Sequence, residues 1–246
     1  MHNLTATIFA AAVADGFIGK TPCQHTAPEK PRRVKVRPLT IDQVQALIEA
    51  APERYSAMVV LAAGCGLRLG EVLGLRAHRV RFLARQLDVV EQLVLIPGSP
   101  PQLGPPKTSS SVRTVPLPSS VANALALHLE RFPLDAKDGL VFRSRTGGPV
   151  WSNTFHGSVW QPLVKRAGLA NGTRFHDLRH FYASALIAAG ESVKTVQAAL
   201  GHSSAVETLE TYAGLWPDAP ERTRAAVDAV LIPTAHGRPE GVVTPL

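Results

Sequence analysis

The spacing of apolar residues predicts two consecutive helices within residues 40–63. In IDQVQALIEAA and RYSAMVVLAA, apolar side chains return every three or four positions, which places them on one face of a helix. Thr40 is followed three positions later by Gln43, the spacing of a capping box, and marks the start of the first helix. The second helix is predicted over residues 54–63, with Gly64 as its terminator.

Short β-branched runs between residues 79 and 118 predict a small antiparallel sheet. Turn-forming residues separate the runs RVRFLA, QLDVVEQLVLI and SVRTVPL, and Lys107 lies in the connection before the last of them. Helical spacing then returns in VANALALHLERF, in residues 151–167, in HDLRHFYASALIAAG, in SVKTVQAAL and in a helix leading to Tyr212. A further helix is predicted over residues 217–231. The predicted fold class is α+β, mainly α, with one small antiparallel β-sheet.

The two ends of the chain differ from its centre. Residues 4–14, LTATIFAAAVA, resemble a signal-peptide core, but no Lys or Arg precedes them, which favours an amphipathic helix ended by Asp15-Gly16. A signal peptide stays open as the alternative. Proline and Lys/Arg are frequent in residues 21–38, which predicts an extended basic linker. The predicted segments are a helical segment over 1–20, the linker over 21–38, a main domain over 39–232 and a flexible tail over 233–246.

The composition is that of a basic globular protein. Lysine and arginine number 26 against 19 aspartate and glutamate, which gives a formal charge of +7 and a pI near 9.8. This charge favours a polyanionic partner such as DNA or RNA, although a generally basic proteome would also explain it. Cys23 and Cys65 have no CxxC spacing, which fits a reducing cytoplasm, and the apolar runs are too short for a membrane anchor.

Four side chains suited to phosphodiester chemistry follow one another between residues 173 and 212. His176 and Arg179 lie in TRFHDLRHFYASALIAAG, His202 lies in VQAALGHSS and Tyr212 lies in ETYAG. Imidazole and guanidinium groups can hold a phosphate, and a phenol can attack it as a nucleophile. The sequence therefore predicts a site for nucleic-acid strand transfer.

These motifs resemble those of the tyrosine recombinases, the phage-integrase family. GCGLRLGEVLGLR is similar to the family's first-arginine motif and PPKTSSSVRTVPL to its β-hairpin lysine motif. HDLRH and LGH are similar to its histidine and second-arginine motifs, and TLETYAG is similar to its nucleophile motif. The resemblance extends from about Pro38 to Asp218 and implies a tyrosine-recombinase-like catalytic domain. The catalytic residues that it implies are Arg68, Lys107, His176, Arg179, His202 and Tyr212.

The resemblance also implies an activity and partners. The protein would be a site-specific DNA recombinase, an integrase of a prophage or mobile element, that cleaves and rejoins strands through a 3′-phosphotyrosine intermediate. Its partners would be double-stranded DNA, other copies of itself in a homo-tetramer on paired DNA sites, and accessory DNA-bending proteins. Such an enzyme is expected in the cytoplasm.

Three of the six residues are suited to holding the phosphate. Guanidiniums present paired donors that match the nonbridging oxygens, so Arg68 and Arg179 are predicted to clamp them. His202 is expected to donate a hydrogen bond to the same group. Arginine and lysine then supply the positive charge that other nucleases take from metal ions, so no metal and no cofactor are expected.

The other three residues are suited to bond exchange. The phenol of Tyr212 must lose its proton as it attacks, and His176 is the best candidate for that proton transfer. The leaving deoxyribose oxygen needs a proton, which an ammonium on a mobile hairpin can deliver. Lys107 is predicted to have this role, as the family also implies.

Two alternative interpretations concern the same motifs. His176 and His180 stand four positions apart, the spacing of paired zinc ligands, but Asp177 takes the place of the glutamate that such a motif requires. His180 is therefore expected to be a structural residue in or near the core. Tyr212 could itself be a core aromatic, the commoner fate of a tyrosine in a helix. The ordered occurrence of all six residues favours the catalytic interpretation.

The N-terminal segment LTATIFAAAVADGFIGKTPC resembles the last helix of the family's core-binding domain and its exit into the linker. Complete family members use that domain to clasp the other face of the DNA, so the chain is expected to be N-terminally truncated and impaired as a strand-transferase. Two other functions stay open. One is a truncated DNA-binding remnant that does not recombine, and the other is a DNA-relaxing enzyme like the type IB topoisomerases.

Overall fold

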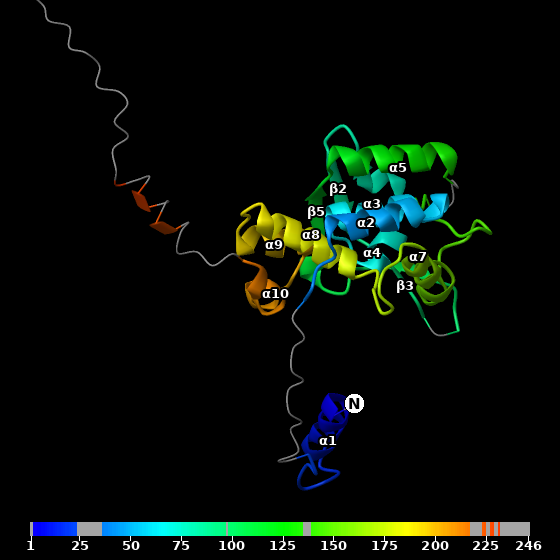
Figure 1. The fold of residues 1–246 in the computed structure, drawn as a ribbon. Helices are drawn as coiled ribbons and strands as arrows, with labels where there is room; N and C mark the ends of the chain where they lie inside the picture. Colours follow the sequence, from blue (N-terminus) through cyan, green and yellow to red (C-terminus); the bar gives the residue numbers. More distant parts are fainter. Residues whose placement is uncertain are drawn as a thin grey trace, which may run out of the picture. The chain divides into compact units, whose positions relative to one another are not determined.

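The computed structural model describes residues 2–23, 36–96, 98–134, 139–216, 223–224, 227–228 and 231. The chain divides into two units, Met1–Lys35 and Val36–Leu246. In the first unit, the helix predicted over residues 4–14 is present as α1 (His2–Ala14) (Figure 1). Most of the predicted linker, the tail over 233–246 and most of the helix predicted over 217–231 lie outside the described residues. None of the described helices is long and apolar enough to cross a membrane.

The second unit begins with the two helices that the apolar spacing predicts. The capping box at the start of α2 (Ile41–Ala50) is confirmed, because the Thr40 side chain accepts a hydrogen bond from the backbone N–H of Gln43, and the Gln43 side chain accepts one from that of Thr40. The next helix, α3 (Glu53–Cys65), ends at Gly66, whose φ of 65° is left-handed.

The prediction that Gly64 ends this helix is wrong. Gly64 lies inside α3 at its contact with α5 (Ser119–Arg131), where a Cβ on Gly64 would lie 2.4 Å from Cγ2 of Val121. Gly64 therefore permits close packing of the two helices, and Gly66 provides the left-handed terminator.

The small antiparallel sheet contains β1 (Val80–Arg81), β2 (Gln86–Val89) and β5 (Arg113–Pro116), in the order β1-β2-β5. A second pair of antiparallel strands is formed by β3 (Gln92–Val94) and β4 (Gln102–Gly104). The run QLDVVEQLVLI thus contributes to both sheets. On β2, Leu87 pairs with Val115 of β5, and both side chains are fully buried.

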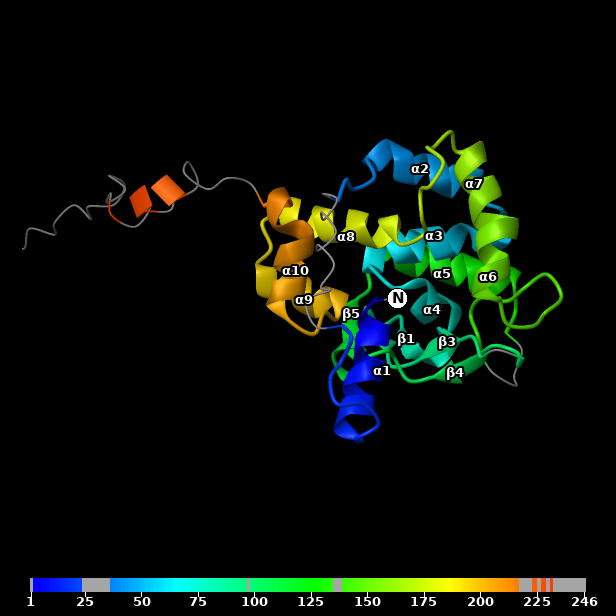
Figure 2. The ribbon, with the colours of Figure 1, turned by 90° about the horizontal axis from the view of Figure 1, so that it is seen from below.

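The remaining helices carry or flank most of the predicted site residues. They are α4 (Leu69–Leu73), α6 (Ser152–Phe155), the π-helix η3 (His156–Trp160), α7 (Gln161–Arg166), α8 (Asp177–Ala188), α9 (Val193–Leu200) and α10 (Ala205–Tyr212). Short 3-10 turns are η1 (Ala77–Arg79), η2 (Ser109–Ser111) and η4 (Ala213–Leu215). Figures 1 and 2 both show α9 and α10 together at one end of the domain, next to α8.

Two apolar clusters hold this unit together. The main cluster surrounds α3, whose Leu61 is fully buried, and includes Leu178 of α8. The small cluster has as its buried members Ala183, Ile187, Val196, Leu200 and Tyr212. The first turn of α8 therefore lies in the main cluster and its later turns in the small one, so that α8 links the two.

Candidate active site

Arg179 on α8 is held by two backbone carbonyls in the interior of the domain. Its side chain is fully buried, and its two terminal nitrogens donate to the backbone carbonyls of Gly66 (2.7 Å) and Leu200 (2.6 Å). These carbonyls lie at the C-terminal ends of α3 and α9, where the helix dipole favours a cation. Burial, and then the charges of Arg68 and Arg113, lower the pKa of Arg179 to about 9, so the guanidinium is still positive at neutral pH.

Arg68 lies at the start of α4, beside a buried carboxylate. Its Nη1 donates to Glu71 Oε1 (2.9 Å) and to Ser111 Oγ (3.2 Å), and its backbone N–H donates to the other oxygen of Glu71 (2.9 Å). Both terminal nitrogens of Arg113 also donate to Glu71. Burial raises the pKa of Glu71, but the hydrogen bonds and charge of Arg113, followed by those of Arg68, outweigh it and lower the pKa overall.

Arg113 ties this carboxylate to the end of α9. Its Nε donates to the carbonyl of Ala199 (2.9 Å), and Gly201 packs directly on its side chain, since a Cβ there would lie 3.1 Å from Arg113 Cδ. Glu71 and Arg113 were not among the residues predicted from the sequence, although both fall inside the quoted motifs. The spacing R-x-x-E in GLRLGEV was the available signal. Three guanidiniums with one carboxylate leave a net positive charge that can attract a phosphate.

His202 lies beyond the end of α9 and is almost completely buried. Its Nδ1 is 2.9 Å from Oγ1 of Thr208, a fully buried residue of α10 that sequence reasoning also missed. Burial, and then the charge of Arg179, lower the pKa of His202 to about 4, so the ring is neutral at pH 7. When Thr208 donates to Nδ1, the hydrogen of the neutral ring is on Nε2, where it can be donated to a phosphate oxygen.

Tyr212 is the last residue of α10 and is 1% exposed. Its Oη is 2.7 Å from Nδ1 of His180, and its ring lies nearly parallel to that of His202, with centroids 6.4 Å apart. Burial raises the pKa of Tyr212 to about 12, although the charges of Arg179 and Arg68 act in the opposite direction. The phenol therefore lies within the field of both arginines.

His176 and Lys107 are placed differently from the other four. His176 is exposed at the start of α8, and its ring meets that of His180 edge-on, with centroids 4.7 Å apart. Lys107 is exposed in the connection from β4 to η2, and the described residues provide it with no hydrogen bond or ion pair. Its neighbour Thr108 contacts Ser111, the residue to which Arg68 donates. The structure thus brings Arg68, Arg179, His202 and Tyr212 together and leaves the Lys107 side chain outside their network.

The described parts of the chain offer no third ligand for a zinc site at His176 and His180. Within these ranges, no group of three or more His, Cys, Asp or Glu side chains could hold a metal ion. His180, expected to be structural, is indeed buried, but it contacts the phenol oxygen of Tyr212.

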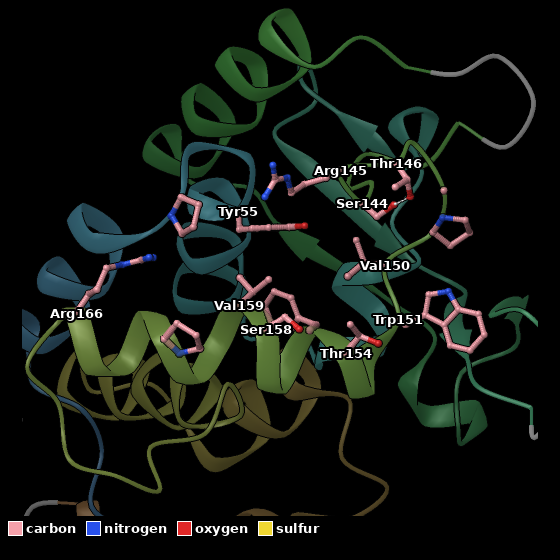
Figure 3. Close-up of a pocket in the computed structure, with 15 residues that line it drawn as sticks. Tyr55, Ser144, Arg145, Thr146, Val150, Trp151, Thr154, Ser158, Val159 and Arg166 are labelled. Atoms are coloured by element: carbon pink, nitrogen blue, oxygen red, sulfur yellow. Dashed lines mark hydrogen bonds between the residues drawn. The ribbon is translucent and has the colours of Figure 1, made fainter.

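A cavity of about 550 Å³ lies at the other end of α3. Figure 3 shows Tyr55 and Val150 pointing into it, with Trp151 and Arg166 at opposite sides. None of the six predicted residues lines it. The rise of an α-helix separates Tyr55 from Gly66 by about 16 Å along α3. The cavity is therefore distinct from the cluster around Arg179.

The family of the chain follows from sequence comparison. The profile described as phage integrase family matches residues 37–216, and the chain belongs to this family. This confirms the resemblance seen in the motifs. A tyrosine recombinase XerC-like protein of Caldanaerobacter subterraneus subsp. tengcongensis is 29% identical over 243 residues, covering 88% of this chain and 62% of that protein. A putative prophage phiRv2 integrase of Mycobacterium tuberculosis is 29% identical over 212 residues, covering 85% and 56%.

The chain spans less than two thirds of the length of these relatives. Among solved structures, it is similar to the Tn1549 transposon integrase in complex with transposon right end DNA, with a TM-score of 0.73 and 25% identity, covering 92% of this chain and 76% of that one. A lambda integrase dimer bound to a COC′ core site shares the fold, with a TM-score of 0.61 and 21% identity, covering 85% and 57%. The predicted fold class is confirmed.

Proposed function

We propose that the protein is a site-specific DNA recombinase that cleaves and rejoins DNA strands through a 3′-phosphotyrosine intermediate. The observation that carries the proposal is a tyrosine within the field of two buried or half-buried arginines, in a chain of the phage integrase family. The proposed catalytic residues are Arg68, Lys107, His176, Arg179, His202 and Tyr212.

Phosphate binding is the task of the arginines and His202. Arg179 is fixed by two carbonyls, so its remaining N–H groups need no reorganisation when a phosphate arrives. Arg68 is held by Glu71 in the same way. These fixed charges stabilise the extra negative charge of the pentacoordinate transition state, so the reaction needs no metal ion.

The bond exchange begins with Tyr212. Its Oη attacks phosphorus, the bond from phosphorus to the 5′ oxygen breaks, and the DNA becomes linked to the protein at its 3′ phosphate. Lys107 gives a proton to the leaving 5′ oxygen. Its exposure on a connecting loop fits a group that must reach the substrate. Because one phosphodiester replaces another, a different 5′ hydroxyl can reverse the step without ATP.

The proposed partners follow from the same chemistry. Double-stranded DNA is the substrate, and the similarity to integrases in complex with DNA supports it. Exchange between two duplexes requires four strand cleavages, so we propose a homo-tetramer on paired sites, with accessory DNA-bending proteins, in the cytoplasm. We propose that residues 39–232 form the catalytic domain and that α1 belongs to the family's core-binding domain. The family membership favours recombination over the function of a topoisomerase or an inactive remnant.

Covalent capture tests the proposal. The protein is incubated with a library of nicked suicide duplexes, and adducts that resist denaturant are isolated and sequenced. We expect adducts through Tyr212 that persist in excess EDTA. An adduct formed equally well by Tyr212→Phe, or cleavage that requires zinc or magnesium, would contradict the proposal.

A further inference from the structure

The cavity at the N-terminal end of α3 contains a buried phenol whose hydroxyl group lacks a protein partner. Tyr55 is 8% exposed, and its side chain points into the cavity (Figure 3). No hydrogen bond joins its hydroxyl to any other described residue. Burial raises the pKa of Tyr55 more than the charges of Arg54 and Arg145 lower it, so the hydroxyl is protonated at neutral pH. Buried polar groups are nearly always hydrogen-bonded, so this donor indicates an acceptor inside the cavity.

A cation opens into the same cavity. Arg145 lines it close to Tyr55, on whose phenol its charge acts. The described residues give the Arg145 side chain no hydrogen bond and no ion pair. The loop that carries it is closed by a hydrogen bond from the backbone N–H of Ser144 to the carbonyl of Gly148 (2.8 Å). A guanidinium and a phenol that face one cavity provide donors suited to the two oxygens of a carboxylate.

The remaining walls of the cavity are mainly apolar. The ring of Tyr55 meets that of Phe155 edge-on, with centroids 5.8 Å apart, and Val150 and Val159 add aliphatic surface. The volume of about 550 Å³ lies within the usual range for sites that bind small molecules. Fixed backbone angles at three prolines restrict how far the walls can rearrange, and these prolines are Pro52, Pro149 and Pro162.

We propose that this cavity binds a small aromatic carboxylate. The carboxylate pairs with Arg145 and accepts the hydrogen bond of the Tyr55 hydroxyl, and the aromatic body packs against Phe155 and Val159. Arg166 also lines the cavity, but its Nη2 already donates to the carbonyl of Ala50 (3.0 Å). None of the six proposed catalytic residues lines the cavity, so the inference goes beyond the proposed function and does not depend on it.

Titration of the full chain without DNA tests the proposal. The probe is biphenyl-4-carboxylate, and binding is followed by calorimetry and by amide chemical shifts. We expect one site with a Kd of about 1 mM or lower, the range for a ligand of this size. The neutral biphenyl-4-carboxamide and inorganic phosphate should each bind at least tenfold more weakly. Equal affinity for acid and amide, equal affinity for phosphate, or no saturable binding of the acid would overturn the proposal.

Two variants remove the proposed donors singly. Arg145→Gln should weaken binding of the acid at least tenfold and leave that of the amide nearly unchanged. Tyr55→Phe keeps the ring against Phe155 and removes only the hydroxyl, so binding of the acid should weaken about fivefold. The matched controls outside the cavity are Arg81→Gln and Tyr182→Phe, which should bind as the parent protein does. Parent affinity in both cavity variants would overturn the proposal.

Filling the cavity checks the location of the ligand. Ser158 is an exposed residue of η3 that lines the cavity, and Ser158→Trp should abolish binding of the acid. Thermal unfolding followed by circular dichroism verifies that each variant is folded. Parent affinity in folded Ser158→Trp would place the ligand elsewhere and overturn the proposal. Because no DNA is present, these outcomes are independent of whether the protein forms a covalent adduct with DNA.

Discussion

The arginine side and the tyrosine side of the site are held in different ways. The arginine side consists of Arg68, Arg113 and Arg179, which bond to backbone carbonyls or to the buried Glu71. On the tyrosine side, Tyr212 is held by a side-chain hydrogen bond to His180 and by the small cluster. The arginine charges are therefore held by a buried carboxylate and by carbonyls at the C-terminal ends of α3 and α9. The proposed nucleophile is held instead by packing and by one side-chain hydrogen bond, at the end of the short helix α10.

Lys107 provides the largest expected effect, because the leaving 5′ oxygen departs poorly without the proton that Lys107 is proposed to give. Lys107→Ala should slow cleavage by about 10²- to 10⁴-fold, the range for losing a general acid. A substrate with sulfur in place of the leaving 5′ oxygen needs no proton to depart and should restore the rate. Equal losses on the two substrates would remove Lys107 from the acid role.

Arg179 tests whether the arginine side acts through preorganised charge. Arg179→Ala should lower the cleavage rate by about 10²- to 10³-fold, the cost of losing a fixed donor to the developing charge. The sulfur substrate should not restore it, in contrast to Lys107→Ala. Arg76→Ala is the control, since Arg76 pairs with Glu91 outside the site, and single-turnover cleavage at saturating DNA should change little.

Replacing one fully buried leucine in each apolar cluster compares how much the two clusters contribute to stability. Leu61→Ala in the main cluster should lower the free energy of global unfolding by about 2–5 kcal/mol. Leu200→Ala in the small cluster should mainly accelerate hydrogen exchange in α9 and α10, with a smaller effect on the denaturant midpoint. Equal shifts of the midpoint for the two variants would show that the clusters unfold as one unit.

Glu71 should make the free energy of unfolding depend on pH in the acid range. Its pKa in the folded protein is below the ordinary value of 4.5, so its contribution to stability is fully present above that pH and disappears as the pH falls through the folded pKa. Glu71→Gln should cost about 1–3 kcal/mol at pH 7, because Arg113 loses its charged partner, and this difference should shrink toward low pH. Denaturant unfolding at several pH values measures it, and a difference independent of pH would contradict the assignment.

Local signals were sufficient for much of the fold. The capping box at Thr40 and the apolar spacing that predicts α5, α8 and α9 depend on residues only a few positions apart, and the structure has these elements. The family motifs likewise predicted Arg68, Arg179, His202 and Tyr212 as site residues, because each motif is a short run whose residue types can be read without knowing their neighbours in space.

Only the tertiary structure decided which side chains meet. His180 and Tyr212 are 32 positions apart, Glu71 and Arg113 are 42 apart, and Arg179 reaches the carbonyl of Gly66 from 113 positions away. Glycine often ends helices, yet Gly64 lies inside α3, where it leaves room for the side chain of Val121 on α5. Periodicity and caps are set by the backbone within one or two turns, whereas a hydrogen bond between distant elements depends on how those elements pack. For this reason the sequence supplies the chemical groups, and packing selects His180 as the partner of Tyr212.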